Sequence, residues 1–251
     1  MGNRVEAYRA AVRVMEDLEA FLLAESRLPG PRGNLELAQA VAEEGSAELF
    51  HHLRSFDAGR APVNTPQEFL AFCGVLGLGR LVTEGDSEAL TALRAHARDP
   101  RWRTREAVAM ALQRWGQVDL PGLMDEMDLW SRGSYLEQRA AVAALCEPAL
   151  LHDPVHVRRV LALLDRVTDA LATAPAEDRR GEEFKALRKG LGYGWSVAAA
   201  ALPDEGKRAI ERWLVFPDRD VAWVMRENLK KARLVRLDAP WVAQAQARLG
   251  T

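Results

Sequence analysis

Several residue types that would narrow the function are scarce in this sequence. Its 251 residues include two cysteines, three tyrosines and five lysines, and isoleucine occurs once, at Ile210. Two cysteines are too few for a disulfide framework, and Cys73 and Cys146 both lie in apolar helical patterns. We therefore expect two buried free thiols, as is typical of a cytoplasmic protein.

Long apolar runs are also absent. The longest stretch without a charged residue, 190–203, has 14 residues, whereas a helix that spans a bilayer needs about 20. The N-terminus leads directly into a charged amphipathic pattern, which is unlike a secretory leader. We expect a soluble cytoplasmic protein that does not enter the membrane.

The usual catalytic motifs are missing as well. The sequence has no phosphate-binding loop, no GxSxG, no HExxH and no CxxC pair. Gly190, Gly192 and Gly194 follow an expected helix rather than a strand, so close helix packing is the better interpretation than a dinucleotide site. His152 and His156 share a helix face but have no further ligands in metal-binding spacing. We expect neither a metal nor a cofactor.

The charge is nearly balanced but unevenly distributed. The net charge of −2 argues against a uniformly basic nucleic-acid binder. Residues 1–90 contain 8 basic and 14 acidic side chains, however, while residues 179–236 contain 14 basic and 8 acidic ones. Of the 34 basic residues, 29 are arginines, whose planar guanidinium suits phosphate and carboxylate. An anionic partner is therefore expected on the C-terminal two-thirds of the chain.

Helical periodicity runs through almost the whole sequence. Apolar residues from Val5 to Leu22 recur every three or four positions, which predicts one long first helix. Asn34 and Ser46 are placed to cap two short helices. The segment 65–68, Thr-Pro-Gln-Glu, predicts another helix start, with the Thr65 hydroxyl as its cap. Strand patterns are nearly absent, so we expect an all-α protein.

A repeat centred on arginine appears in the second part of the chain. Arg105, Arg139, Arg188 and Arg226 are 34, 49 and 38 residues apart, and each is followed three positions later by an aliphatic residue. A period near 40 residues with paired helices is typical of HEAT or armadillo repeats. We therefore predict an α-α superhelix, a curved solenoid forming one monomeric domain over 1–251. Residues 1–85 would be an N-terminal helical cap, and residues 86–251 the HEAT-like repeats.

Tryptophan is abundant, and Trp102 has an unusual setting. All seven tryptophans fall after residue 101, and most are expected in the core because they bury a large area. Trp102 lies at an expected helix start between Arg101 and Arg103, with Glu106 one turn later on the same face. Two interpretations remain open. Trp102 covers the core beneath an Arg–Glu network, or it cradles a cationic group beside the carboxylate.

Three stretches of the chain resemble a known family. They are Trp102 with Glu106, the segment from Leu123 through Trp130 to Val142, and the segment from Phe184 to Tyr193 followed by Trp195. Over about residues 85–235 the chain resembles the bacterial alkylpurine DNA glycosylases built of HEAT-like repeats, the AlkD type. That resemblance implies a concave, basic groove that holds duplex DNA and promotes release of a cationic alkylated purine.

The resemblance also implies roles for individual residues. The family's catalytic aromatic residue falls on Trp102, its aspartate on Glu106, and the arginine that holds the DNA backbone on Arg139. A second aromatic residue of the groove falls on Tyr193. Arg103 and Arg188 are expected to extend the positive groove alongside Arg139. A carboxylate at this place would stabilise the sugar cation that forms as the glycosidic bond breaks.

The sequence leaves three functions open. The chain is a HEAT-like protein that binds DNA or RNA without catalysis, an active alkylpurine DNA glycosylase, or a scaffold that binds a protein on its concave face. The sequence leaves open whether the repeat arginines point into a groove or form ion pairs between repeats. A groove containing Arg103, Arg139 and Arg188 would favour nucleic acid.

Overall fold

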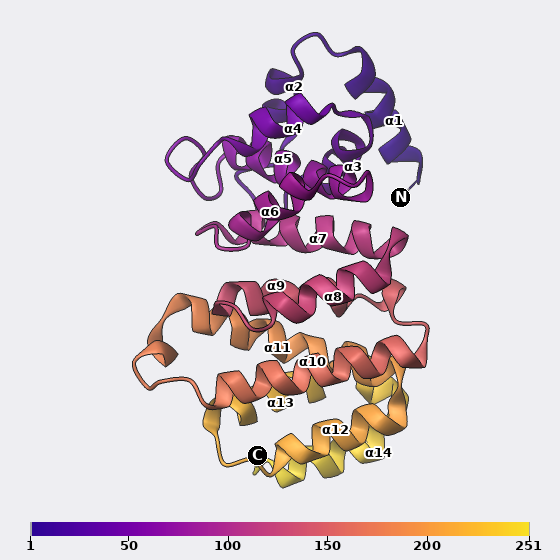
Figure 1. Cartoon of the computed structure of the whole chain (residues 1–251), viewed down its shortest axis with the longest axis vertical. Coiled ribbons are helices and arrows are strands. Elements are labelled where there is room, and N and C mark those ends of the chain that lie inside the picture. The colour runs from indigo at the N-terminus through magenta and orange to yellow at the C-terminus, as the bar shows by residue number, and fades with distance from the viewer. Residues whose placement is uncertain (1, 251) are drawn as a thin grey trace. The chain divides into compact units, whose positions relative to one another are not determined.

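The computed structural model describes residues 2–250 and is helical throughout. No strand occurs within this range, so the predicted all-α class is confirmed. The chain divides into two compact units, the first ending at Asp119 and the second beginning at Leu120. The sequence predicts that the repeats begin at residue 86. Helices α6 and α7 lie after that position, but both pack against α5 within the first unit. Figure 1 shows both units, coloured from indigo to yellow along the chain.

The first unit is organised around a buried central helix, α5. Its helices are α1 (Gly2–Val14), α2 (Leu18–Glu25), α3 (Leu35–Glu44), α4 (Ala47–Arg54), α5 (Pro66–Thr83), α6 (Ser87–His96) and α7 (Trp102–Val118). Fourteen of the 18 residues of α5 are buried, because a helix that is apolar on all sides must be surrounded by others. Helices α2, α3, α4, α6 and α7 all contact α5, and α1 packs on α3.

The N-terminal region forms two helices, so the prediction of one long helix is wrong. Helix α1 ends at Val14 and α2 begins at Leu18. The carboxylate of Asp17 accepts a hydrogen bond of 3.0 Å from the backbone N–H of Ala20 and caps α2. The apolar spacing continues across this break, and periodicity alone therefore does not reveal it.

Two of the three predicted caps of the first unit are confirmed. The side chains of Asn34 and Ser46 accept hydrogen bonds from the backbone of α3 and α4. Helix α5 begins at Pro66 as expected, but the Thr65 hydroxyl does not cap it. This hydroxyl instead donates to the carbonyl oxygen of Pro62 at 2.7 Å. The preceding loop competes for the hydroxyl, because short polar side chains near helix ends can bond to nearby backbone groups outside the helix.

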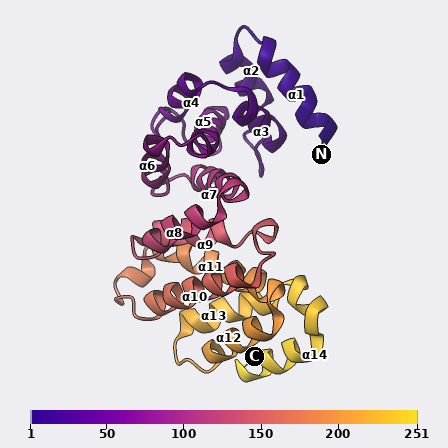
Figure 2. The same cartoon turned by 45° about the vertical axis from the view of Figure 1, so that its right-hand side comes forward.

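In the second unit, alternate helices pack side by side. Its elements are α8 (Leu120–Trp130), α9 (Tyr135–Leu145), η1 (Pro148–Leu150), α10 (Pro154–Ala172), η2 (Asp178–Arg180), α11 (Glu182–Ala201), α12 (Pro203–Leu214), α13 (Arg219–Leu229) and α14 (Ala232–Arg248). Helices α9, α11 and α13 lie next to one another in one layer, with α11 in the middle. Helices α10 and α12 pack on one face of this layer, against α11 (Figure 1, Figure 2). Helix α14 returns to contact α11, α12 and α13.

Glycines permit the close contacts around α11. The three glycines of the GxGxG pattern all lie inside this helix, which supports the packing interpretation. A Cβ at Gly194 would lie 2.9 Å from Val142 Cγ1 and 3.0 Å from the sulfur of Cys146. Cys73 and Cys146 are buried free thiols, as predicted. Burial raises the pKa of the Cys146 thiol to about 12.

The contact between α11 and α12 depends on Gly206. A Cβ at this position would lie 2.3 Å from the Cα of Ala199, which is backbone and cannot rotate away. We expect Gly206→Ala to lower the free energy of unfolding by about 1–3 kcal/mol, because α12 must shift away from α11. Urea denaturation measures this effect. Gly59→Ala is the control, since Gly59 lies in a surface loop, and an equal loss in both variants would contradict the packing argument.

The tryptophans are less buried than predicted. All seven lie in the described range, and Trp130 and Trp195 are fully buried. Trp115, Trp213, Trp223 and Trp241 are half-buried, so the expectation that most lie in the core is wrong. The indole N–H explains part of this placement, because it needs a polar partner. Those of Trp213 and Trp241 donate to Asp165 at 2.8 Å and to Glu211 at 2.7 Å.

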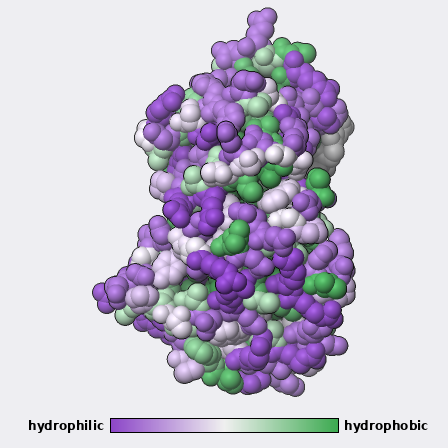
Figure 3. All heavy atoms as spheres, viewed as in Figure 1, coloured by the Kyte–Doolittle hydropathy of each residue, from purple (hydrophilic) through white to green (hydrophobic). Residues whose placement is uncertain are grey.

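The surface is largely polar. The face drawn in Figure 3 is mostly hydrophilic, and its hydrophobic residues form small scattered groups. Among residues 2–250, no helix combines the length and the apolar composition that crossing a membrane requires.

Candidate functional site

The predicted catalytic pair, Trp102 and Glu106, lines one pocket of the first unit. Trp102 is the first residue of α7 and is 46% exposed, and Glu106 lies one turn further along the same face. The pocket has a volume of about 230 Å³ and is lined also by residues of α3, α5 and the loop before α3. Its walls are mostly apolar, with Phe69 and Phe72 on the side of α5. A catalytic role for the pair stays a prediction.

Arg103, predicted to contact nucleic acid, lies inside the first unit. Its side chain is 7% exposed, and Nη1 forms an ion pair of 2.9 Å with Oε2 of Glu68, which is completely buried. Its Nη2 donates to the carbonyl oxygen of Gly30 at 2.6 Å. The guanidinium carbon also lies 4.4 Å from the centre of the Trp102 ring. Arg103 thus joins α7 to α5 through Glu68 and packs against one face of the Trp102 ring.

Arg105 of the same helix also bonds inward. Its Nη1 donates to the carbonyl oxygens of Asp99 at 2.6 Å and Pro100 at 2.9 Å, which lie in the turn before α7. Arg103 therefore forms an ion pair between two helices, whereas Arg105 bonds to backbone carbonyl groups of the turn before its own helix. Both guanidinium groups hold neighbouring elements together within the first unit.

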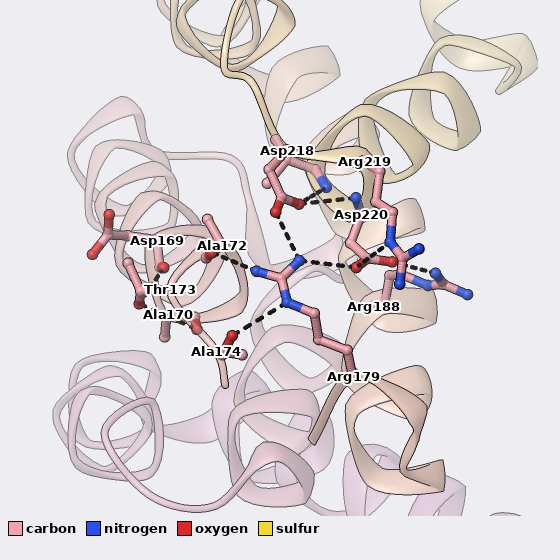
Figure 4. Close-up of polar contacts among 11 residues, drawn as sticks. Asp169, Ala170, Ala172, Thr173, Ala174, Arg179, Arg188, Asp218, Arg219 and Asp220 are labelled. Atoms are coloured by element: carbon pink, nitrogen blue, oxygen red, sulfur yellow. Dashed lines mark hydrogen bonds and ion pairs between the residues drawn. The ribbon is translucent and has the colours of Figure 1, made fainter. Parts of the chain in front are cut away.

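Arg188, another predicted groove cation, belongs to an ion-pair network in the second unit (Figure 4). Its guanidinium pairs with Asp220 at the start of α13 and lies 4.6 Å from the centre of the Trp223 ring. Asp220 is 3% exposed and is shared with Arg179, whose Nη1 lies 3.0 Å from Oδ2. The network joins α11 to α13, which is the inter-helix role that the sequence left as an alternative.

Arg179 is the centre of the same network. It pairs with Asp218 at 2.7 Å, and it donates to the carbonyl oxygens of Ala172 at 2.6 Å and Ala174 at 3.2 Å (Figure 4). Ala172 is the last residue of α10, where carbonyl groups have no partner within the helix. One side chain therefore closes the end of α10 and fixes the N-terminus of α13. The hydrogen bonds that Arg179 donates to the carboxylates of Asp218 and Asp220 raise the pKa of Arg179.

Arg139 and Tyr193 lie on neighbouring helices of the second unit. Arg139 is half-buried on α9, and its side chain lies across Gly190 of α11, where a Cβ would be 3.4 Å from Arg139 Cγ. Gly190 and Tyr193 share a face of α11 because they are three residues apart. The structure thus brings together two of the residues to which the resemblance assigns DNA contacts.

Tyr193 is surrounded by cations that sequence reasoning did not identify. Its side chain is 44% exposed, and the Arg233 guanidinium carbon lies 4.6 Å from the ring centre. Arg233 also donates to the Tyr193 hydroxyl, and Lys231 Nζ lies 5.9 Å from the ring centre. Lys189 is exposed one turn before Tyr193 on the same face of α11. We call Arg139, Lys189, Tyr193, Lys231 and Arg233 the Tyr193 surface.

The sequence offered one signal for these additional residues, the basic excess in 179–236. This excess did not point to Lys231 and Arg233 in particular. Lys231 immediately precedes α14 and Arg233 lies in its first turn, and both come close to Tyr193 because α14 folds back onto α11. The predicted site residues thus fall into two groups. Trp102, Arg103 and Glu106 belong to the first unit, and Arg139, Arg188 and Tyr193 belong to the second.

Metal-binding groups are not found in the part of the chain that the structure describes. No cluster of three or more His, Cys, Asp or Glu side chains within it is arranged to hold a metal ion. When the chain is compared with models of protein families, with curated proteins and with solved structures, none of the three comparisons gives a match.

Proposed function

We propose that this chain binds nucleic acid, with duplex DNA as its partner, and that the Tyr193 surface contacts the phosphate backbone. The observation that carries this proposal is the exposed ring of Tyr193, beside which the cations of Arg233 and Lys231 lie. Cationic side chains supply the electrostatic part of nucleic-acid affinity, and an exposed aromatic ring among them offers a surface for stacking on sugars or bases.

The surroundings of the Tyr193 surface support this role. The carboxylate nearest to this surface is that of Glu227, which lies beside Gly192 and is paired with Lys230 at 2.6 Å. The positive charges of Arg179 and Arg188 are largely balanced by Asp218 and Asp220. The positive charge of the second unit is therefore better available at the Tyr193 surface than around Arg188.

We further propose that the second unit is a HEAT-like solenoid. The support is the order of its helices, since α9, α11 and α13 pack as successive neighbours while α10 and α12 lie on the other side of α11. Repeats of helix pairs stack in this way, and each layer then presents a continuous surface. Arg139 and Tyr193 come from successive helices of one layer, as expected for residues that face a common partner.

Binding to a duplex of about 20 base pairs tests the proposal. A fluorescence-anisotropy titration is expected to show binding at 50 mM salt that becomes roughly 40-fold weaker at 200 mM, if three phosphate contacts are made. An unlabelled duplex serves as the competitor. Absence of binding at 50 mM salt, or binding that does not change with salt, would contradict the proposal and favour a protein partner.

A further inference from the structure

The pocket beside Trp102 has the construction of a small-molecule site. It lies entirely in the first unit, between α3, α5 and α7, and its volume is about 230 Å³. Leu28, Leu35, Phe69, Phe72 and Met110 provide most of its wall, with Trp102 at the edge. A mostly apolar cavity with a few polar groups is typical of a ligand site. Its size suits a small aromatic system or a medium-length aliphatic chain.

The walls are held rigidly by the core. Phe69 and Phe72 are 1% and 5% exposed, and their rings are almost parallel, with an angle of 7° and centres 6.3 Å apart. Both belong to α5, which is surrounded by other helices. Gly33 packs beside Phe69, because a Cβ at this position would lie 3.4 Å from the ring. The cavity is thus preformed, and the missing side chain at Gly33 leaves room in it.

One buried polar group of the lining lacks a partner. Arg103 is 6% exposed and lines the pocket, and its Nε has no hydrogen-bond partner although Nη1 and Nη2 do. A buried donor without a partner is uncommon, because it loses its hydration without compensation. The Nε–H is covered by surrounding atoms, so a ligand acceptor satisfies it when a small shift of the lining uncovers it.

The charges of the lining favour an anionic acceptor. Arg32 is an exposed cation of the lining, and Glu106 is the one carboxylate among the lining residues. The charge of Arg103 is balanced by Glu68 behind the pocket, so Arg103 contributes its unpartnered Nε–H rather than a free charge. Guanidinium groups bind carboxylate and sulfonate oxygens strongly, since the hydrogen bonds are charge-assisted. The apolar walls, the cation of Arg32 and the unpartnered Nε–H of Arg103 together describe a molecule with an apolar body and one acidic group.

We propose that this pocket binds a small apolar anion, with its ring system or chain between Phe72 and Trp102 and its acidic group toward Arg103 and Arg32. The inference goes beyond the proposed nucleic-acid function, because every lining residue belongs to the first unit and the Tyr193 surface belongs to the second. Either site can therefore fail its test without deciding the other.

Two fluorescent probes that share the same rings test the proposal on the full chain. They are 8-anilinonaphthalene-1-sulfonate, which is anionic, and N-phenyl-1-naphthylamine, which is neutral. We expect both to bind with enhanced emission and the sulfonate to bind about fivefold or more tightly. Absence of saturable binding overturns the proposal, and equal affinities overturn the assignment of an anion.

Variants of the lining locate the probe. Gly33→Leu and Met110→Trp fill the pocket, and each is expected to weaken binding of both probes by about tenfold or more. Val63→Leu is the matched control, because it adds bulk to an exposed residue of the same unit outside the pocket. Unchanged binding in both filling variants, with native circular dichroism, would show that the probe binds elsewhere and would overturn the proposal.

Arg32 tests the position of the acidic group. Arg32→Gln is expected to weaken the sulfonate probe about threefold to tenfold and to leave the neutral probe unchanged. Arg27→Gln is the charge-matched control, since Arg27 pairs with Glu36 on the surface and does not line the pocket. An equal effect of both variants on the sulfonate would assign its binding to general surface charge and contradict the proposed orientation.

Discussion

Arg103→Ala is expected to lower the free energy of unfolding by about 3–5 kcal/mol, the largest effect of any single substitution considered. The reason is the carboxylate of Glu68, which is completely buried and pairs with Arg103 at 2.9 Å. Removing the guanidinium leaves this charge in the interior without its counter-ion. It also removes the hydrogen bond to the carbonyl oxygen of Gly30. Urea denaturation followed by circular dichroism measures the change.

A double variant separates the ion pair from the packing of its side chains. Arg103→Met combined with Glu68→Leu replaces both charges by apolar groups, and we expect it to be more stable than either single variant, since no buried charge is left alone. Arg32→Ala is the control at an exposed arginine of the same unit, with an expected change below about 0.5 kcal/mol. A double variant as unstable as the sum of the single variants would contradict this account of the pair.

Asp220→Ala is expected to cost about 2–3 kcal/mol, because this buried carboxylate joins two arginines from different elements. Arg188 would lose its carboxylate partner Asp220, and its Nε has no hydrogen-bond partner even in the wild type. Arg179 would keep Asp218 and its two carbonyl acceptors, so the loss is smaller than at Arg103. Differential scanning calorimetry is expected to show a lower melting temperature for this variant.

The control for Asp220 is a carboxylate in an exposed ion pair. Asp125 pairs with Arg159 at 2.8 Å, but its side chain is 75% exposed. Asp125→Ala is therefore expected to change stability by less than about 1 kcal/mol. Equal losses at Asp125 and Asp220 would mean that burial does not determine the strength of these pairs, which would contradict the role given to the network of Figure 4.

Local sequence signals predicted the helical class and several helix boundaries. Asn34 and Ser46 cap the helices that they were expected to cap, because a cap depends on residues within one turn. The break at Asp17 and the alternative bond of Thr65 were not predicted. At Asp17 a side-chain cap competes with continuation of the helix, and at Thr65 the hydroxyl bonds to the preceding loop instead of the helix; the apolar pattern reveals neither choice.

The partners of the arginines could not be predicted, since they are distant in sequence. Glu68 and Arg103 are 35 residues apart, and Arg188 and Asp220 are 32 residues apart. No periodic pattern links such positions, and only the packing of whole helices brings them together. The Tyr193 surface has the same origin, because Lys231 and Arg233 reach Tyr193 through the return of α14 onto α11.

The salt dependence of duplex DNA binding by a Tyr193-surface variant tests the central claim most directly. Lys231→Ala with Arg233→Ala is expected to raise the Kd about tenfold at 50 mM salt and to reduce the slope of log K against log salt by about two, one for each lost phosphate contact. The control is Arg158→Ala, which removes an arginine paired with Glu205 outside this surface and should leave the slope unchanged. A double variant that binds DNA with the affinity and slope of the wild type would contradict the claim.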